Sequence, residues 1–101
     1  GTVSAQGQDW FNLVRDRAFK DTKHRISLSG LTKQQALDVI FKERGYEFID
    51  EMQRWFDILR FDKGTEILGA KGWTEKYRYF PIDQSEIDRT NGILKQNPGW
   101  M

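Results

Sequence analysis

The chain has 101 residues, with 16 Lys or Arg, 15 Asp or Glu, a net charge of +1 and no Cys. A length near 100 is typical of one domain with a single core, and without cysteine the chain has no disulfide, thiolate metal site or cysteine nucleophile. The near-zero net charge gives no general field toward nucleic acids or acidic lipids, and no stretch approaches the roughly 20 apolar residues that cross a bilayer.

The first helix is expected shortly after the start of the chain. Residues 1–8 are small and polar, so we expect a disordered end or a cloning boundary there, and the domain itself over 9–101. From Asp9, which can cap a helix, apolar residues recur at spacings of three and four, the pattern of one helical face. The pattern predicts a helix from Asp9 to near Lys20, followed by a basic surface loop over 21–30.

The second helix has a clear start, because Thr32 and Gln35 fit the capping box. From Lys33 an apolar stripe continues at spacings of three, four or seven to Arg60. Its members are Leu37, Ile40, Phe41, Phe48, Met52, Trp55, Ile58 and Leu59. Gly45 lies inside the stripe and costs about 1 kcal/mol relative to Ala, which leaves a kink or a break there open. The stripe predicts one long amphipathic helix.

The length of this helix suggests that the chain needs neighbours. A helix over 33–60 would be roughly 42 Å long, whereas a 100-residue globule has a radius of gyration of about 13 Å. Apolar residues also lie off the main stripe, at Val39, Tyr46, Ile49 and Phe56. A helix that is apolar on several sides is normally enclosed by other helices. We infer that the chain is part of something larger, or that it forms a homo-oligomer in isolation.

Charged residues interrupt the apolar stripe. Arg44 and Glu51 project at nearly the same helical angle as Trp55, and each has an opposite charge three residues further along. We interpret these charges as a structural ion-pair network of Arg44, Glu47, Glu51 and Arg54. The alternative is a catalytic carboxylate pair, as in glycoside hydrolysis. It is less favoured, because side chains one turn apart face the same way and neighbouring arginines keep both carboxylates ionised.

The C-terminal part is rich in glycine and aromatic residues. The alternation over 76–80 fits a short strand, and an irregular loop pinned by its rings fits equally. Asp83 followed by Glu86 is a second possible capping box and predicts a short helix through Asp88. The turn-rich tail over 91–100 should wrap over the surface.

The lone histidine, His24, gives no catalytic or metal site. Either role needs partners, and the chain has no second His and no Cys, so we expect an exposed loop residue. The sequence accordingly predicts no catalytic residue, no metal and no cofactor.

Four aromatic residues are candidate ligand-binding residues: Trp73, Tyr77, Tyr79 and Trp100. Aromatic faces stack on the apolar surface that the axial C–H groups of a sugar present, so these rings could form a carbohydrate platform. We prefer the simpler interpretation, that they fasten the loops to the helices. A platform for single-stranded nucleic acid is opposed by the balanced charge and by the lack of a recognised RNA-binding motif.

Five sequence blocks, in order, resemble the C-terminal part of the RagB/SusD family. They are N-L-V-R-D-R-A over 12–18, E-R-G-Y-E-F over 43–48, R-W-F-D-I-L-R-F over 54–61, F-P-I-D-Q-S-E-I-D over 80–88 and Q-N-P-G-W over 96–100. The resemblance implies an almost wholly helical fold of tetratricopeptide-like helix pairs with long irregular loops. It also implies that the arginine and glutamate network is scaffold.

The same resemblance implies a function. Members of the family are nutrient-binding lipoproteins on the outer membrane of Bacteroidetes, and they hold oligosaccharides or other nutrients above a SusC-like TonB-dependent transporter. We therefore expect the C-terminal portion of such a surface lipoprotein, without catalysis; the family's lipid-bearing cysteine is not in this chain. The alternative is a free-standing helical module that oligomerises or docks a partner through its apolar helix faces.

Overall fold

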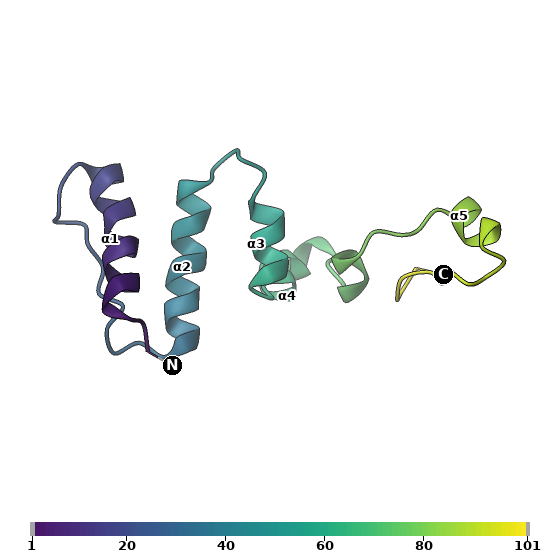
Figure 1. The fold of residues 1–101 in the computed structure, drawn as a ribbon, viewed down its shortest axis with the longest axis horizontal. Coiled ribbons are helices and arrows are strands. Elements are labelled where there is room, and N and C mark those ends of the chain that lie inside the picture. Colours follow the sequence, from purple (N-terminus) through teal and green to yellow (C-terminus); the bar gives the residue numbers. More distant parts are fainter. Residues whose placement is uncertain (1, 101) are drawn as a thin grey trace. The chain divides into compact units, whose positions relative to one another are not determined.

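The computed structural model describes residues 2–100 (Figure 1). Over these residues the chain is 56% helical and has no strand, which confirms the predicted mainly α fold. It divides into two compact units, with the boundary after Ile49. The single core that the length predicted is therefore wrong. None of the helices in this range is long and apolar enough to cross a membrane.

Helix α1 (Ala5–Phe19) begins four residues earlier than predicted. The Ser4 hydroxyl accepts a hydrogen bond from the Gly7 N–H at 3.0 Å, a serine cap that places 5–8 in the first turn. The expected disordered end is therefore wrong for these four residues, and Gly1 lies outside the described residues. The helix ends near Lys20 as predicted, where the backbone turns left-handed with φ 59°.

The segment over 20–32, which we call the return segment, is not a free surface loop, because it runs back along α1 and is hydrogen-bonded to it. The Gln8 amide donates to the carbonyl of Ile26 at 2.8 Å and accepts from the N–H of Leu28 at 2.5 Å. Asn12 accepts from the Ile26 N–H at 3.2 Å. These bonds hold Leu28, which is 1% exposed, in the small core of the first unit.

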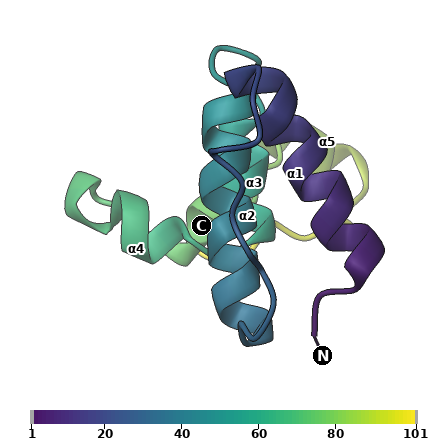
Figure 2. The same cartoon turned by 90° about the vertical axis from the view of Figure 1, so that its left-hand side faces the viewer.

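Helix α2 (Lys33–Glu47) begins at the predicted capping box. The Thr32 hydroxyl accepts from the Gln35 N–H at 3.2 Å, and the Gln35 side chain accepts from the Thr32 N–H at 2.9 Å. Figures 1 and 2 show α1 and α2 side by side and running in the same direction, with the return segment between their ends. Ala36 and Phe41 of α2 are buried.

The predicted single long helix is wrong, because it is two helices. Helix α2 ends at Glu47, and six residues separate it from the start of α3 (Arg54–Arg60). The backbone between them is left-handed at Asp50 and Met52, with φ 62° and 57°, which no helix can contain. The break follows Gly45 rather than falling on it. Since α2 is only roughly 22 Å long at 1.5 Å per residue, the argument from a 42 Å helix no longer applies.

The second unit is made of short helices joined by turns. They are α3, α4 (Gly64–Leu68), two 3₁₀ helices, η1 (Gly69–Lys71) and η2 (Glu75–Arg78), and α5 (Gln84–Arg89). Asp57 and Ile58 of α3 are buried. The strand considered for 76–80 is wrong, because η2 occupies most of that stretch.

The tail returns over this unit, as the sequence predicts. The Gln96 amide pairs with both backbone groups of Ile82, each at 2.8 Å. Asn97 donates to the carbonyl of Phe80 at 2.6 Å. The Gln96 amide thus holds the tail in the same way that the Gln8 amide holds the return segment. Both amides bond to backbone groups that have no β-strand partner.

Asp83 caps the start of helix α5, as predicted, although the cap differs from the expected box. The Asp83 carboxylate accepts from the N–H of Ser85 at 2.8 Å and from its hydroxyl at 2.5 Å. These bonds, from the hydroxyl first and the backbone second, hold the pKa of Asp83 below its ordinary value of 3.8.

We expect Asp83→Asn to change the acid sensitivity of the fold and little else. A lowered pKa in the folded state means that the stabilisation is complete above pH 3.8 and is lost as the pH falls below it. Asparagine caps a helix about as well as aspartate but does not titrate. Thermal unfolding followed at neutral pH and below pH 3.8 should show a shallower acid loss for this variant. Asp9→Asn, on an exposed part of α1, is the control, and identical acid profiles for both variants would contradict the expectation.

Candidate functional site

The aromatic residues of the second unit form a continuous row, which we call the aromatic row: Trp55, Trp73, Tyr77 and Trp100. The ring centroids of Trp55 and Trp73 are 5.6 Å apart at 68°, those of Trp73 and Tyr77 are 6.1 Å apart at 41°, and those of Tyr77 and Trp100 are 5.6 Å apart at 82°. Such tilted and edge-to-face contacts are the favourable geometries for aromatic pairs. Three of the four predicted candidates are therefore neighbours, and Trp55 is a member that the sequence analysis assigned to the apolar stripe.

Trp73 is positioned by the end of η1. The N–H of Gly72 bonds to the carbonyl of Gly69 at 3.0 Å, and the N–H of Trp73 bonds to the carbonyl of Leu68 at 3.1 Å. This is the Schellman arrangement, which needs a left-handed residue, and Gly72 has φ 88°. The indole lies against Gly64, and its buried N–H has no acceptor among the described residues.

Trp100 fastens the tail to η2. Its indole N–H donates to the carbonyls of Lys76 and Tyr79, at 2.9 Å each. The Lys76 ammonium lies 4.6 Å from the centre of the Trp100 ring and 5.1 Å from that of Tyr77, within cation–π range. Because these ring faces already have partners, the contacts fit the preferred interpretation that Tyr77 and Trp100 fasten loops.

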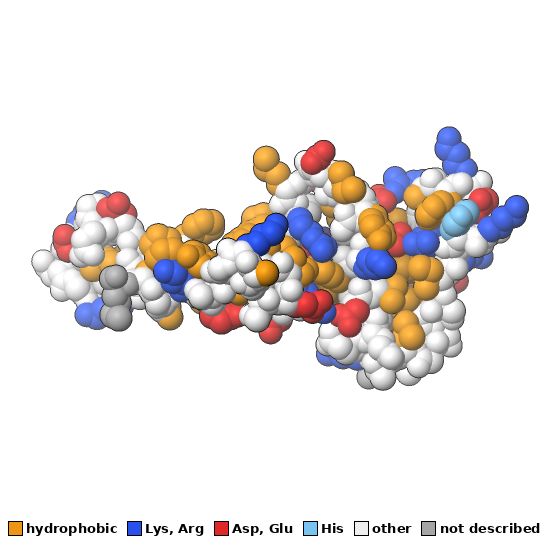
Figure 3. Space-filling model, turned by 180° about the vertical axis from the view of Figure 1, so that it is seen from behind, with side chains coloured by type: hydrophobic (Ala, Val, Ile, Leu, Met, Phe, Trp, Pro, Cys, Tyr) orange, Lys and Arg blue, Asp and Glu red, His pale blue; other side chains and the backbone are white. Residues whose placement is uncertain are grey.

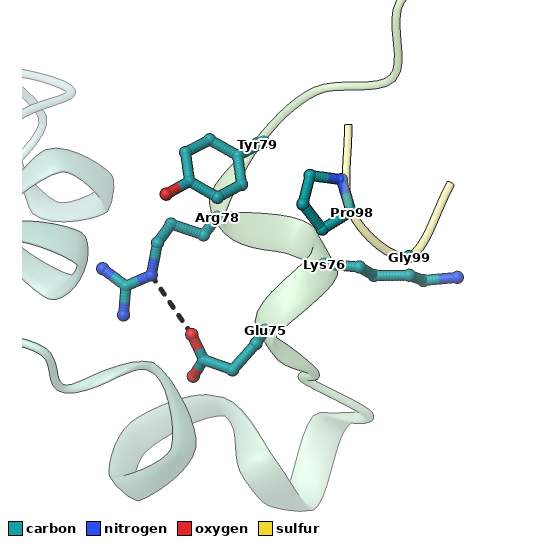
Figure 4. A pocket seen from close by; sticks show the side chains of 6 residues that line it. All are labelled: Glu75, Lys76, Arg78, Tyr79, Pro98 and Gly99. Carbon is teal, nitrogen blue, oxygen red and sulfur yellow. Dashed lines mark hydrogen bonds and ion pairs between the residues drawn. The ribbon is translucent and has the colours of Figure 1, made fainter. Parts of the chain in front are cut away.

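Two hollows lie beside the aromatic row. The first has a volume of about 250 Å³ and is lined by Trp55, Leu68, Lys71, Gly72, Trp73 and Tyr77. The second has a volume of about 380 Å³ and is lined by Glu75, Lys76, Arg78, Tyr79, Pro98 and Gly99 (Figure 4). Tyr79, the fourth candidate, belongs to the second hollow and is 52% exposed.

The arginine in the second hollow is already paired with carboxylates. Figure 4 shows the Arg78 guanidinium turned toward the Glu75 carboxylate, with a nitrogen-to-oxygen distance of 3.1 Å. Arg78 also pairs with Asp62 and donates to the carbonyl of Leu59 at 3.1 Å. The hydrogen bonds that Arg78 donates to Asp62 first, and then to Glu75, raise the pKa of Arg78 above its ordinary value. Arg78 thus ties η2 to the chain after α3.

The predicted ion-pair network is not on one helix. Glu47 pairs with Arg17 of α1, and the Arg44 guanidinium lies 4.8 Å from the centre of the Phe48 ring. Glu51 is an exposed residue of the connection between α2 and α3, and Arg54 is the exposed first residue of α3. The geometry assumed for a pair of catalytic carboxylates is absent as well, since Glu51 lies outside the helix that holds Glu47.

The ion pair that sequence reasoning missed joins Arg15 and Glu43. Their side chains are 12% and 14% exposed, and the charged atoms are 2.5 Å apart. Arg15 and Arg17 are two residues apart on α1, whereas their partners Glu43 and Glu47 are four residues apart on α2, so no shared spacing in the sequence signals the pairing. Both ion pairs follow one another in the same direction along the two helices, as the parallel alignment of α1 and α2 requires.

His24 lies on the return segment and is half exposed. Its ring stacks on Phe19 with centroids 4.1 Å apart, and its Nδ1 lies 2.9 Å from the Asp21 carboxylate. The hydrogen bond to His24, followed by that from the Lys23 N–H, lowers the pKa of Asp21. Within residues 2–100 no group of three or more His, Cys, Asp or Glu is placed to hold a metal ion.

Comparison with known proteins supplies the family. The model of the SusD family matches residues 2–72. SusD-like protein P2 of Formosa agariphila is 27% identical over 107 residues, an alignment that covers 96% of this chain and 21% of the relative. The chain thus spans about a fifth of the length of the curated relative that it matches. No solved structure matches.

The family match covers α1, α2, α3, α4 and η1, and the alignment with the relative extends over nearly the whole chain. It includes three of the five sequence blocks on which the resemblance to the RagB/SusD C-terminal part was based, those over 12–18, 43–48 and 54–61. That resemblance is confirmed. The chain belongs to the SusD family.

Proposed function

We propose that the protein to which this chain belongs binds a nutrient, in the first instance an oligosaccharide, at the surface of the outer membrane and passes it to a SusC-like TonB-dependent transporter. The observation behind this proposal is the match to the SusD family over residues 2–72. Proteins of this family are binding proteins, so the proposed role includes no catalysis.

The exposed apolar residues support a place for this chain inside a larger helical body. Six large apolar side chains are each at least 61% exposed: Trp10, Leu13, Ile49, Met52, Phe80 and Ile93. Figure 3 shows apolar side chains at the surface in several separate patches. Soluble monomers seldom leave so much apolar area uncovered, which favours further helices as the cover. Association of the isolated chain with itself is the other way to cover it, and remains a prediction.

The proposal is tested on the natural polypeptide that contains this sequence. We expect an affinity-tagged form to be recovered in the outer-membrane fraction together with a TonB-dependent transporter, and to bind an oligosaccharide in calorimetry. Recovery outside that fraction, with neither a transporter nor a bound sugar, would contradict it. That result would favour the alternative, a free-standing helical interaction module.

A further inference from the structure

The first hollow beside the aromatic row has the size and lining of a subsite for a single ring. Its volume of about 250 Å³ falls below the roughly 300 Å³ at which sites for drug-sized ligands begin. Trp55, Trp73 and Tyr77 supply aromatic walls, and Leu68 supplies an aliphatic one. Aromatic walls suit a pyranose, whose axial C–H groups form an apolar face.

The only charge in this lining is positive. Lys71 is exposed and forms no ion pair with any described residue. The acidic residues of the adjoining helices are engaged elsewhere, since Glu66 pairs with Lys63 and Glu75 with Arg78. The ammonium of Lys71 is therefore available to an anion beside an apolar surface, where a charged hydrogen bond is stronger than in open water.

The local backbone places Lys71 at the edge of the hollow. Lys71 is the last residue of η1 and directly precedes Gly72, whose left-handed turn also orients Trp73. The two hydrogen bonds of the Schellman arrangement fix that turn. Because the turn and Trp73 are set by backbone geometry, this part of the site needs less ordering when a ligand binds.

The second hollow lacks this combination. Its Arg78 is held by Asp62 and Glu75, and its Lys76 lies over the rings of the aromatic row. Both cations there already have partners, so an anion would be bound less tightly there than beside Lys71 in the first hollow.

We propose that the hollow lined by Trp55, Trp73, Tyr77 and Lys71 is a subsite for one negatively charged sugar ring, a uronic acid or a sulfated sugar. The tryptophan rings stack on the sugar, Tyr77 closes one side of the hollow, and Lys71 pairs with the carboxylate or sulfate of the sugar. This inference rests on the proposed function and names the class of glycan that the protein selects.

The test uses the natural polypeptide that contains this chain and three hexasaccharides: neutral maltohexaose, hexagalacturonate and a hexamer of a sulfated galactan. We expect at least one charged hexamer to bind more tightly than maltohexaose, and its binding to weaken with added salt. The charged hexamer that binds more tightly identifies the anion. Lys71→Gln should weaken that binding about two- to fivefold, and Lys71→Glu by at least about tenfold, with maltohexaose unchanged.

Lys95→Gln and Lys95→Glu are matched controls, because Lys95 is an exposed lysine of the same unit outside the lining of the hollow. Equal losses for the two lysines, or equal binding of neutral and charged hexamers, would overturn the subsite while leaving nutrient binding in place. Absence of any sugar binding together with absence of a transporter would remove the proposed function as well. The lysine variants are surface changes, so thermal unfolding should be unaltered and separates binding from folding.

Discussion

Arg15→Ala is expected to destabilise the unit formed by α1 and α2 by about 3 kcal/mol, whereas Arg17→Ala is expected to cost less than about 1 kcal/mol. The two arginines lie two residues apart on α1, and each pairs with a glutamate of α2. They differ in burial, since the Arg15 side chain is 12% exposed and the Arg17 side chain 66%. Each variant removes one positive charge from α1, so the two differ only in the surroundings of the arginine that is removed.

The larger effect follows from the number of elements that Arg15 joins. Its guanidinium pairs with Glu43 at 2.5 Å, donates to the His24 carbonyl of the return segment at 2.5 Å, and lies 5.1 Å from the centre of the Phe19 ring. Removing it leaves the Glu43 carboxylate, which is 14% exposed, without its counter-ion. Because both partners keep some contact with water, the expected loss is at the lower end of the range for buried pairs.

Urea unfolding of the unchanged protein, Arg15→Ala and Arg17→Ala measures this difference in the free energy of unfolding. Glu43→Gln should also destabilise strongly, because it leaves Arg15 as an unpaired and largely buried cation. A similar small loss for the Arg15 and Arg17 variants would show that the alignment of α1 and α2 depends on apolar packing instead.

Much of the fold follows from local sequence signals. The capping box at Thr32 and Gln35 places the start of α2, and Asp83 places the start of α5, because both use side chains within three residues of the backbone group that they satisfy. Ser4 is a signal of the same kind that was overlooked in a polar stretch. Capping signals therefore place the starts of α2 and α5, whereas Asp9 misplaces the start of α1, and α3 and α4 have no side-chain cap to read.

The break after α2 was not readable, because the apolar spacing continues across it. Phe48, Met52 and Trp55 keep helical intervals although the backbone between the helices is not helical. The left-handed residues are Asp50 and Met52, and neither is a glycine that would mark such a turn. Periodicity reports which side chains are apolar, and here it does not report the backbone that joins them.

The candidate site likewise has features that the sequence shows and contacts that it does not. The aromatic candidates were evident from composition, whereas the contacts that assemble them are long-range, such as the 24-residue separation between Lys76 and Trp100. The ion pairs were assigned within one helix because i, i+3 spacing was the available rule, while the actual partner of Glu47 is Arg17 on α1. Pairing between elements needs their relative placement, which one sequence does not contain.

The close packing of Trp73 on Gly64 leads to the second large expected effect. A Cβ at position 64 would lie 2.6 Å from Nε1 of Trp73 and closer still to two carbons of the same ring. No atom of a rigid indole can yield there without moving the whole ring, and Trp73 is held by its backbone bond to Leu68 and by its contacts with Trp55 and Tyr77. Gly64→Ala should therefore destabilise the second unit by about 1 to 3 kcal/mol.

Gly69→Ala is the matched control, since it makes the same change at the other end of α4. Its nearest neighbour would be a methyl carbon of Thr65 at 4.0 Å, and its φ of −54° is helical. Restricting the unfolded chain without strain in the folded one should stabilise by about 0.4 to 1 kcal/mol, so the two alanines are expected to act in opposite directions. Tryptophan fluorescence during thermal unfolding follows both, and an unshifted spectrum and midpoint for Gly64→Ala would mean that Trp73 does not lie against this glycine. Because Trp73 also lines the first hollow, the same variant should weaken sugar binding there while Gly69→Ala leaves it intact.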